Sequence, residues 1–316
     1  MKILIYGAGT IGLSYAWLLS SKNNVEIFIK KEKMSLYKNG VTLSIKNLKN
    51  KETEYKNYLF YPKCTSTLDD TYDLIIITVN SMQLQNALQD LYKYKGKSIF
   101  LILQNNWNIQ SALKPYFSLN DCVIGFPSSI GGGRNGINLK VIFFDTETLL
   151  GENNTGKNEQ TIIIKNVFED SNIHSKMIKK IDEWLKVHAL QQAVTSGAIL
   201  EAGNYNDFVK NFLNVKKMIL AWREGILLCE YLGIRAKNIF PSRYLFFPTV
   251  LITLLIKFVL QQANTSEMIK GHLNSGLIEW ATQYKEILTL AETIGFSMPT
   301  WKSYDSFVTN YLKEEL

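Results

Sequence analysis

The sequence has 316 residues, of which 46% are hydrophobic and 20% are charged, and this balance excludes a long disordered chain. The formal net charge is +7, but the lysines and arginines form no run of five or more. A nucleic-acid-binding tail is therefore not indicated, and a small anionic ligand suits the diffuse positive charge better. The length is enough for two domains.

Cysteine and histidine usage argues against a disulfide framework or a metal site. Cys64, Cys122 and Cys229 are far apart without a CxxC pair, and the three histidines do not cluster at ligand spacing. The most apolar stretch, residues 248–260, is interrupted by Lys257 and is too short to span a bilayer. No signal peptide is indicated at the N-terminus. We therefore expect a cytoplasmic protein with neither a metal nor a nucleic-acid or membrane partner.

The first third of the chain alternates between buried strands and helices. Continuous apolar runs, as expected for parallel strands covered on both faces, occupy residues 2–6, 25–29, 73–79 and 98–103. Helical spacing follows at residues 13–21 and 83–93. This alternation predicts a parallel sheet with right-handed crossovers.

The rest of the chain changes character twice. Short strands are predicted at residues 123–126, 139–144 and 161–165, and we expect them to extend the same sheet. After residue 170 nearly everything has helical spacing, in four long segments: residues 177–200, 207–232, 248–262 and 272–294. A boundary between 165 and 175 follows, which predicts an α/β domain at 1–170 and an all-α domain at 171–316.

A G-x-G-x-x-G sequence, Gly7 to Gly12, lies between the first strand and the first helix. In this context Gly7 permits a tight turn, Gly9 lets backbone N–H groups approach a pyrophosphate, and Gly12 allows close packing of helix on strand. Thr10 and Ile11 open the helix, whose N-terminus favours anions. We therefore predict a Rossmann dinucleotide-binding domain; the alternative is a turn without a ligand.

The end of the second strand indicates which dinucleotide binds. An NAD site usually has an acidic residue there, but Glu26 lies too early in the strand. Lys30 and Lys31 stand at its tip, where an ammonium group can meet a 2′-phosphate. This pattern favours NADP(H). The alternative is that both lysines are ordinary solvated surface charge.

In ordered features along nearly its whole length, the chain resembles the ketopantoate reductase (2-dehydropantoate 2-reductase) family. These features are residues 2–12, Leu103-Gln-Asn-Asn106, Gly131-Gly-Gly-Arg134, Leu150-Gly-Glu152, Trp184-Leu-Lys186, Arg223-Glu-Gly225, Gly233-Ile234, and Glu279 ahead of Gly295-Phe-Ser-Met-Pro299. The resemblance implies a Rossmann domain followed by a helical domain like the C-terminal domain of 6-phosphogluconate dehydrogenase. It also implies NADPH-dependent reduction of a small 2-oxo acid, with ketopantoate as the default substrate.

The resemblance assigns roles residue by residue. Lys186 matches the lysine that donates a proton to the ketone oxygen, a role that suits an ammonium group beside a developing alkoxide. Glu279 matches a glutamate that binds substrate, and Asn204 and Asn105 match asparagines near substrate or nicotinamide. Asn80 takes the place of a frequent lysine and is assigned to the cofactor. The alternatives are a surface lysine, a solvent-facing glutamate and a turn asparagine.

Two positions depart from the family pattern. Leu190 and Val194 stand where the family carries asparagines, four and eight residues after the lysine. His188 and Gln192, one helical turn apart, are candidates for replacement polar contacts to substrate. These departures leave two further hypotheses open: a reductase of a less polar carbonyl compound, and a non-catalytic NADP(H)-binding regulator. The apolar C-terminal helices are compatible with a homodimer.

Overall fold

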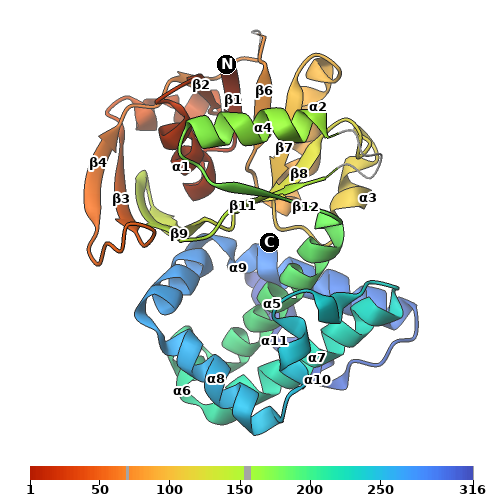
Figure 1. The fold of residues 1–316 in the computed structure, drawn as a ribbon. Helices are drawn as coiled ribbons and strands as arrows, with labels where there is room; N and C mark the ends of the chain where they lie inside the picture. Colours follow the sequence, from red (N-terminus) through yellow and green to blue (C-terminus); the bar gives the residue numbers. More distant parts are fainter. Residues whose placement is uncertain (69–70, 153–157, 316) are drawn as a thin grey trace. The chain divides into compact units, whose positions relative to one another are not determined.

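The computed structural model describes residues 1–68, 71–152 and 158–315, and the chain divides into two units, Met1–Asp182 and Glu183–Leu316 (Figure 1). The first unit is an α/β structure and the second is helical. Among the described residues, no helix is long and apolar enough to cross a membrane, and no group of His, Cys, Asp or Glu is arranged to hold a metal ion.

The first unit is built on an eight-stranded sheet in the order β12-β11-β8-β7-β6-β1-β2-β5. All neighbouring pairs are parallel except β8 with β11. The strands are β1 (Lys2–Tyr6), β2 (Asn24–Phe28), β5 (Cys64–Thr65), β6 (Leu74–Ile77), β7 (Ile99–Leu103), β8 (Val123–Phe126), β11 (Thr148–Gly151) and β12 (Ser175–Ile178). The central strands are apolar on both faces, as the continuous runs predict, and β6 is buried at every position.

Helices and short 3₁₀ segments connect these strands. They are α1 (Thr10–Leu19), η1 (Lys31–Tyr37), η2 (Ser81–Gln83), α2 (Leu84–Leu91), η3 (Tyr92–Tyr94), α3 (Ile109–Leu113) and α4 (Glu159–Asp170). In Figure 1, α4 runs across one side of the sheet, beside β11 and β12. Because β12 pairs with β11, the first unit continues to Asp182, beyond the expected boundary at 170.

A second sheet of four strands, in the order β4-β3-β10-β9, packs near α1. Its strands are β3 (Val41–Asn47), β4 (Lys56–Phe60), β9 (Ile130–Asn135) and β10 (Asn138–Phe143). The expectation that residues 139–144 extend the first sheet is therefore wrong. The run is a strand, but β10 pairs with β3 and β9 instead. One hydrophobic core, which includes Leu13 of α1 together with Leu43 and Val141, joins the helix to both sheets.

Residues 161–165 were expected to form a strand, and they lie instead in the helix α4. The buried positions of α4 are Thr161, Ile164, Val167 and Phe168, a helical spacing, whereas Ile162 and Ile163 are largely exposed. The row of three isoleucines has strand propensity. The helical spacing of the buried positions outweighs it here.

The second unit consists of helices. They are α5 (Ile181–Ala202), which begins at the end of the first unit, then α6 (Tyr205–Lys210), α7 (Phe212–Tyr231), η4 (Ala236–Asn238), η5 (Ser242–Phe246), α8 (Thr249–Gln261), α9 (Ala263–Thr293), α10 (Pro299–Lys302) and α11 (Asp305–Glu315). The single helix predicted at 207–232 is broken at Asn211, whose side chain accepts a hydrogen bond from the Leu213 N–H and caps α7.

Candidate functional site

The glycine-rich turn joins β1 to α1, and each of its glycines has a different environment. A Cβ atom on Gly12 would lie 1.8 Å from the Gly7 carbonyl oxygen, so the helix can approach the strand this closely only without a side chain. Gly7 has a φ of +129° and lies against Thr78, at the end of β6. By contrast, a Cβ on Gly9 would meet nothing within 4 Å. The turn therefore has a tight base and an open position at Gly9.

The N-terminus of α1 completes this anion-binding geometry. Gly9 is the N-cap residue, and no side chain caps the helix. The first turn contains no acidic residue, so nothing there repels an anion. The N–H groups of the first turn, including those of Thr10 and Ile11, have no partner within the helix itself. A cradle with an open glycine and a free helix N-terminus fits the pyrophosphate of a dinucleotide.

The expected cofactor residues of four strands meet at one edge of the sheet. β2, β1, β6 and β7 are neighbours, and all four run in the same direction. Lys30, Gly7, Asn80 and Asn105 follow the carboxyl ends of these strands in that order. The structure therefore brings the predicted cofactor residues together at the edge where open α/β sheets bind ligands.

Polar side chains hold the turns at this edge. The Gln104 amide donates to the carbonyl oxygens of Val79 (2.7 Å) and Asn80 (3.0 Å), which ties the end of β7 to the end of β6. The Asn80 side chain accepts from the Gln83 N–H at 3.1 Å and caps η2. Asn80 thus has a structural task in addition to its predicted cofactor contact. From the sequence, Gln104 was quoted only as part of the Leu103-Gln-Asn-Asn106 turn, and no role was assigned to it.

The tip of β2 separates a buried carboxylate from two exposed ammonium groups. Lys30 and Lys31 are exposed, and Lys31 begins η1. Glu26 is buried, accepts a hydrogen bond from Tyr72 (2.8 Å) and pairs with Lys63 (2.7 Å). Burial alone would raise the pKa of the Glu26 carboxyl, but these bonds and the charges of Lys2 and Lys63 outweigh burial and lower the pKa. Glu26 is therefore a structural ion-pair residue.

In the second unit, the expected catalytic and substrate residues lie on two helices. Lys186 and His188 are on α5, and Glu279 is on α9. The imidazole of His188 stacks on Trp184, with ring centroids 4.9 Å apart. Burial and the nearby His272 lower the pKa of His188 to about 4, so this imidazole is neutral at pH 7 and suited to a neutral hydrogen bond.

Asn204 has a defined structural role as the N-cap of α6. Its side-chain oxygen accepts from the Asp207 N–H at 2.9 Å, and its amide nitrogen donates to the Asp207 carboxylate at 2.6 Å. Both ends of the amide are thus engaged within one turn. The Asn204 amide would have to make its predicted contact with substrate in addition to these two hydrogen bonds.

The two aliphatic departures from the family pattern are explained by packing. Leu190 and Val194 are completely buried. A Cβ on Gly225 of α7 would lie 2.7 Å from a Leu190 methyl group and 3.1 Å from Trp301, so Leu190 occupies space that the glycine leaves open. These side chains therefore build the core of the second unit.

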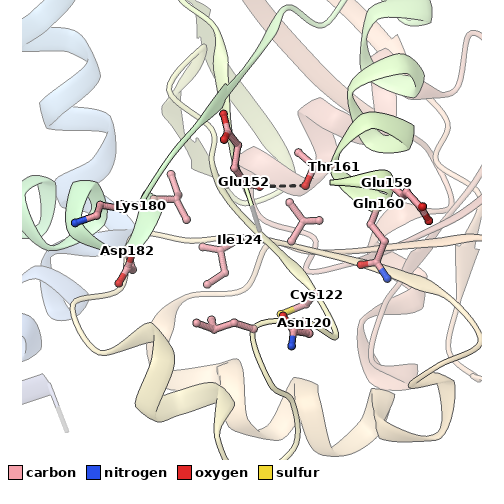
Figure 2. A pocket seen from close by; sticks show the side chains of 13 residues that line it. Asn120, Cys122, Ile124, Glu152, Glu159, Gln160, Thr161, Lys180 and Asp182 are labelled. Atoms are coloured by element: carbon pink, nitrogen blue, oxygen red, sulfur yellow. Dashed lines mark hydrogen bonds between the residues drawn. The ribbon is translucent and has the colours of Figure 1, made fainter. Parts of the chain in front are cut away.

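The first unit also has a separate pocket, which lies at the amino-terminal end of β8 (Figure 2). Cys122 and Ile124 line it at the start of the strand, together with Glu152 and Thr161, whose hydroxyl donates to the Gly151 carbonyl at 3.0 Å. None of the residues predicted for cofactor or substrate lines this pocket.

Fold and turn together define the class: a Rossmann protein whose glycine-rich turn suits a dinucleotide. Residues 3–154 match the family described as "Ketopantoate reductase PanE/ApbA". Residues 3–154 therefore carry a ketopantoate reductase domain of divergent sequence, which covers just under half of the chain.

Solved structures share this fold along the whole chain at low sequence identity. A ternary structure of D-mandelate dehydrogenase with NADH and anilino(oxo)acetate is 17% identical with a TM-score of 0.77, covering 99% of each chain. A probable 2-dehydropantoate 2-reductase from Bacillus subtilis is 15% identical with a TM-score of 0.70, covering 98% of this chain and 99% of its own. Dimeric ketopantoate reductase from Staphylococcus aureus is 17% identical with a TM-score of 0.71, covering 100% of both. No curated protein matches the chain.

Proposed function

We propose that the protein reduces a small 2-oxo acid to the 2-hydroxy acid with NADPH in the cytoplasm, and that ketopantoate is the first substrate to test. The observation that carries the proposal is the glycine-rich turn, open at Gly9 and closed at Gly7 and Gly12, within a match to the ketopantoate reductase family. The nicotinamide cofactor supplies the hydride when bound. The chain's own residues must bind the acid, orient its carbonyl and deliver a proton.

In this proposal Lys186 is the proton donor. An ammonium group stabilises negative charge that develops on the carbonyl oxygen and then protonates that oxygen. Glu279, Asn105, Asn204 and His188 are proposed to orient the substrate. A neutral His188 can donate or accept a hydrogen bond without bringing a second positive charge to the substrate.

A second candidate substrate class is a 2-oxo acid with an aromatic or bulky apolar group. The observation that favours it is a pair of flat ring stacks in the second unit. His188 lies on Trp184, and His272 lies on Trp280 with centroids 6.0 Å apart. Such surfaces suit an aromatic ring better than a small polar chain. The D-mandelate dehydrogenase with the same fold was solved with anilino(oxo)acetate, which carries an aromatic ring.

The apolar face of α8 supports a homodimer. Val250, Leu251, Leu254, Leu255 and Phe258 each expose more than half of their surface. The charged group of α8, the Lys257 ammonium, donates to the Lys210 carbonyl at 2.7 Å. A soluble protein rarely exposes so large an apolar face unless something covers it, and two copies of one face are complementary by symmetry. We propose that α8 of a second copy covers it.

The deciding experiment measures NADPH oxidation at neutral pH with ketopantoate and, separately, phenylglyoxylate. The variants are Lys186→Ala and, as a control, Lys313→Ala, which removes an exposed lysine of α11. We expect Lys186→Ala to lose on the order of 100-fold or more in kcat while NADPH still binds, and Lys313→Ala to match the parent. Faster turnover of phenylglyoxylate would favour the aromatic substrate class. NADPH binding without oxidation by any 2-oxo acid would support the remaining alternative, a non-catalytic NADP(H)-binding regulator.

A further inference from the structure

We propose that Arg134 is a positioning residue that fixes the phosphate-binding conformation of the glycine-rich turn from the second sheet. Arg134 lies on β9, far along the chain from the turn. Its guanidinium Nη1 donates a hydrogen bond to the Ala8 carbonyl oxygen at 2.9 Å. The inference rests on the nicotinamide-dinucleotide site of the proposed function, and not on the identity of the substrate.

The guanidinium is held from a second direction as well. Its Nε donates to the carbonyl oxygen of Gly136 at 2.9 Å, in the turn that joins β9 to β10. An arginine side chain has many rotamers, and two hydrogen bonds to fixed carbonyls select one of them. The Arg134 side chain is therefore a rigid strut between the β9–β10 turn and Ala8.

The backbone of the second sheet is built to place this strut. Gly132 has a φ of +136°, and a Cβ on it would lie 2.0 Å from the Lys140 carbonyl oxygen. Arg134 pairs with Leu139 of β10, which is buried in the core that the second sheet shares with α1. The position of β9 is thus fixed by packing and does not depend on the arginine alone.

The bond to Ala8 determines which way the turn presents its N–H groups. In a trans peptide the C=O of one residue and the N–H of the next point in opposite directions. When Arg134 holds the Ala8 carbonyl, the Gly9 N–H is turned away from the guanidinium and remains available to a phosphate oxygen. Thr78 holds the preceding carbonyl in the same manner, with its hydroxyl 2.9 Å from the Gly7 oxygen.

Two successive peptide groups are therefore clamped by side chains from outside the turn. Consecutive N–H groups fixed in this way form a concave anion site, and they need no reorganisation when the pyrophosphate binds. The positive charge of Arg134 beside the turn adds a favourable potential for that anion. Loss of the strut should weaken the pyrophosphate contact more than any contact of the adenosine.

The test compares Arg134→Met and Arg134→Lys with the control Lys22→Met, which removes an exposed cation of the same unit. Dissociation constants for NADPH and NADH are measured by nucleotide fluorescence. The affinity for 2′-AMP, which has the adenosine 2′-phosphate but no pyrophosphate, is measured by calorimetry. If the parent prefers NADH to NADPH, adenosine is used as the probe in place of 2′-AMP. Melting temperatures are recorded for every variant.

We expect Arg134→Met to weaken the preferred dinucleotide at least tenfold while the adenosine probe changes less than twofold, Arg134→Lys to recover part of the loss, and Lys22→Met to match the parent. Equal weakening of both ligands, unchanged dinucleotide affinity, or failure of both Arg134 variants to fold would each overturn the inference. A parent that binds neither dinucleotide would overturn it together with the proposed function. A parent that binds NADPH but reduces no 2-oxo acid would overturn the proposed function alone.

Discussion

The imidazole of His188 lies nearly parallel to the indole of Trp184, with an angle of 10° between the ring planes. The two residues are one turn apart on α5, so the stack forms along the surface of a single helix. Stacking and burial remove water from the ring, and His272 is close enough to disfavour a second positive charge. His188 is therefore a neutral side chain whose protonation opposes folding.

The first prediction concerns acid stability. The pKa of His188 is about 4 in the folded protein, compared with an ordinary value of 6.5. Between these two pH values the unfolded chain therefore binds a proton that the folded chain does not bind. The free energy of unfolding should fall by up to roughly 3 kcal/mol between pH 6.5 and pH 4. Burial lowers the pKa of His272 as well, which acts in the same direction. Urea unfolding as a function of pH measures this loss.

The matched variants are His188→Gln and His174→Gln. His174 is exposed, so its replacement should leave the pH dependence unchanged. His188→Gln should flatten the fall in stability over this range. Parallel curves for the parent and His188→Gln would show that the site does not control acid stability.

Gly9 and Gly12 are predicted to respond differently to the same added methyl group. Gly9→Ala should leave the free energy of unfolding within about 0.5 kcal/mol of the parent, because nothing lies near its Cβ position. It should nevertheless weaken NADPH binding, because the methyl group enters the cradle. Gly12→Ala should cost several kcal/mol, on the order of 2–4, because its Cβ would overlap the Gly7 carbonyl. Thermal unfolding and NADPH titration separate the two effects, and an unchanged NADPH affinity in Gly9→Ala would place the pyrophosphate elsewhere.

Cofactor choice is predicted to depend on the tip of β2. Replacing Lys30 and Lys31 together with Gln removes two exposed cations and should weaken NADPH by on the order of 10-fold or more, while NADH binding changes little. The control Lys22→Gln removes a cation at the other end of β2. If NADPH and NADH lose affinity equally, the lysines act through general charge and do not read the 2′-phosphate.

Glu224 is predicted to stabilise the end of the chain. Its carboxylate oxygens accept the N–H groups of Thr300 (3.0 Å) and Trp301 (2.8 Å), at the start of α10. Glu224→Ala leaves these donors unpaired and should destabilise the protein by about 1–3 kcal/mol. Glu224→Gln, which keeps one acceptor oxygen, should lose less, and Glu314→Ala on α11 serves as the control. Equal stability of Glu224→Ala and the parent would mean that water replaces the carboxylate.

The apolar face of α8 gives a prediction about mass in solution. Leu254→Glu places a charge in the middle of this face and should convert a dimer into a monomer, as measured by analytical ultracentrifugation. Leu213→Glu, at another exposed leucine, should leave the mass unchanged. A parent that is already monomeric at micromolar concentration would exclude this use of α8.

Most of the first sheet could be predicted from the sequence because its strands are continuous apolar runs around a G-x-G-x-x-G turn. The second sheet was not predicted. β3 alternates between buried and half-buried positions over Val41–Asn47, but β4 is largely exposed, and β10 finds its partner far away in the chain. The strand propensity of residues 161–165 also gave a wrong prediction. These residues form part of the helix α4, whose buried positions have helical spacing. Leu190 could not be explained from the sequence for a different reason. It stands where an asparagine was expected because its side chain packs against Gly225 and Trp301 of other helices, and local spacing does not reveal such contacts.

The same limit applies to the candidate site. Sequence spacing identified Gly7, Gly9 and Gly12 and the strand ends that meet beside them. It did not reveal that Gln104 ties β7 to β6, or that Arg134 reaches Ala8, because both contacts depend on tertiary structure. The roles proposed for Lys186 and Glu279 rest on family resemblance and await the kinetic test.

The parallel pairing of β10 with β3 also sets an order of events during synthesis. Leu139 lies opposite Leu43, so β3 and β4 leave the ribosome long before the strand that completes their sheet. Until then the β3 edge has unpaired backbone groups, and pairing across so long a loop is slow. Arg134 arrives with the same late hairpin. The glycine-rich turn is translated before this hairpin, yet it acquires its Arg134 contact only after residues 130–143 have been made.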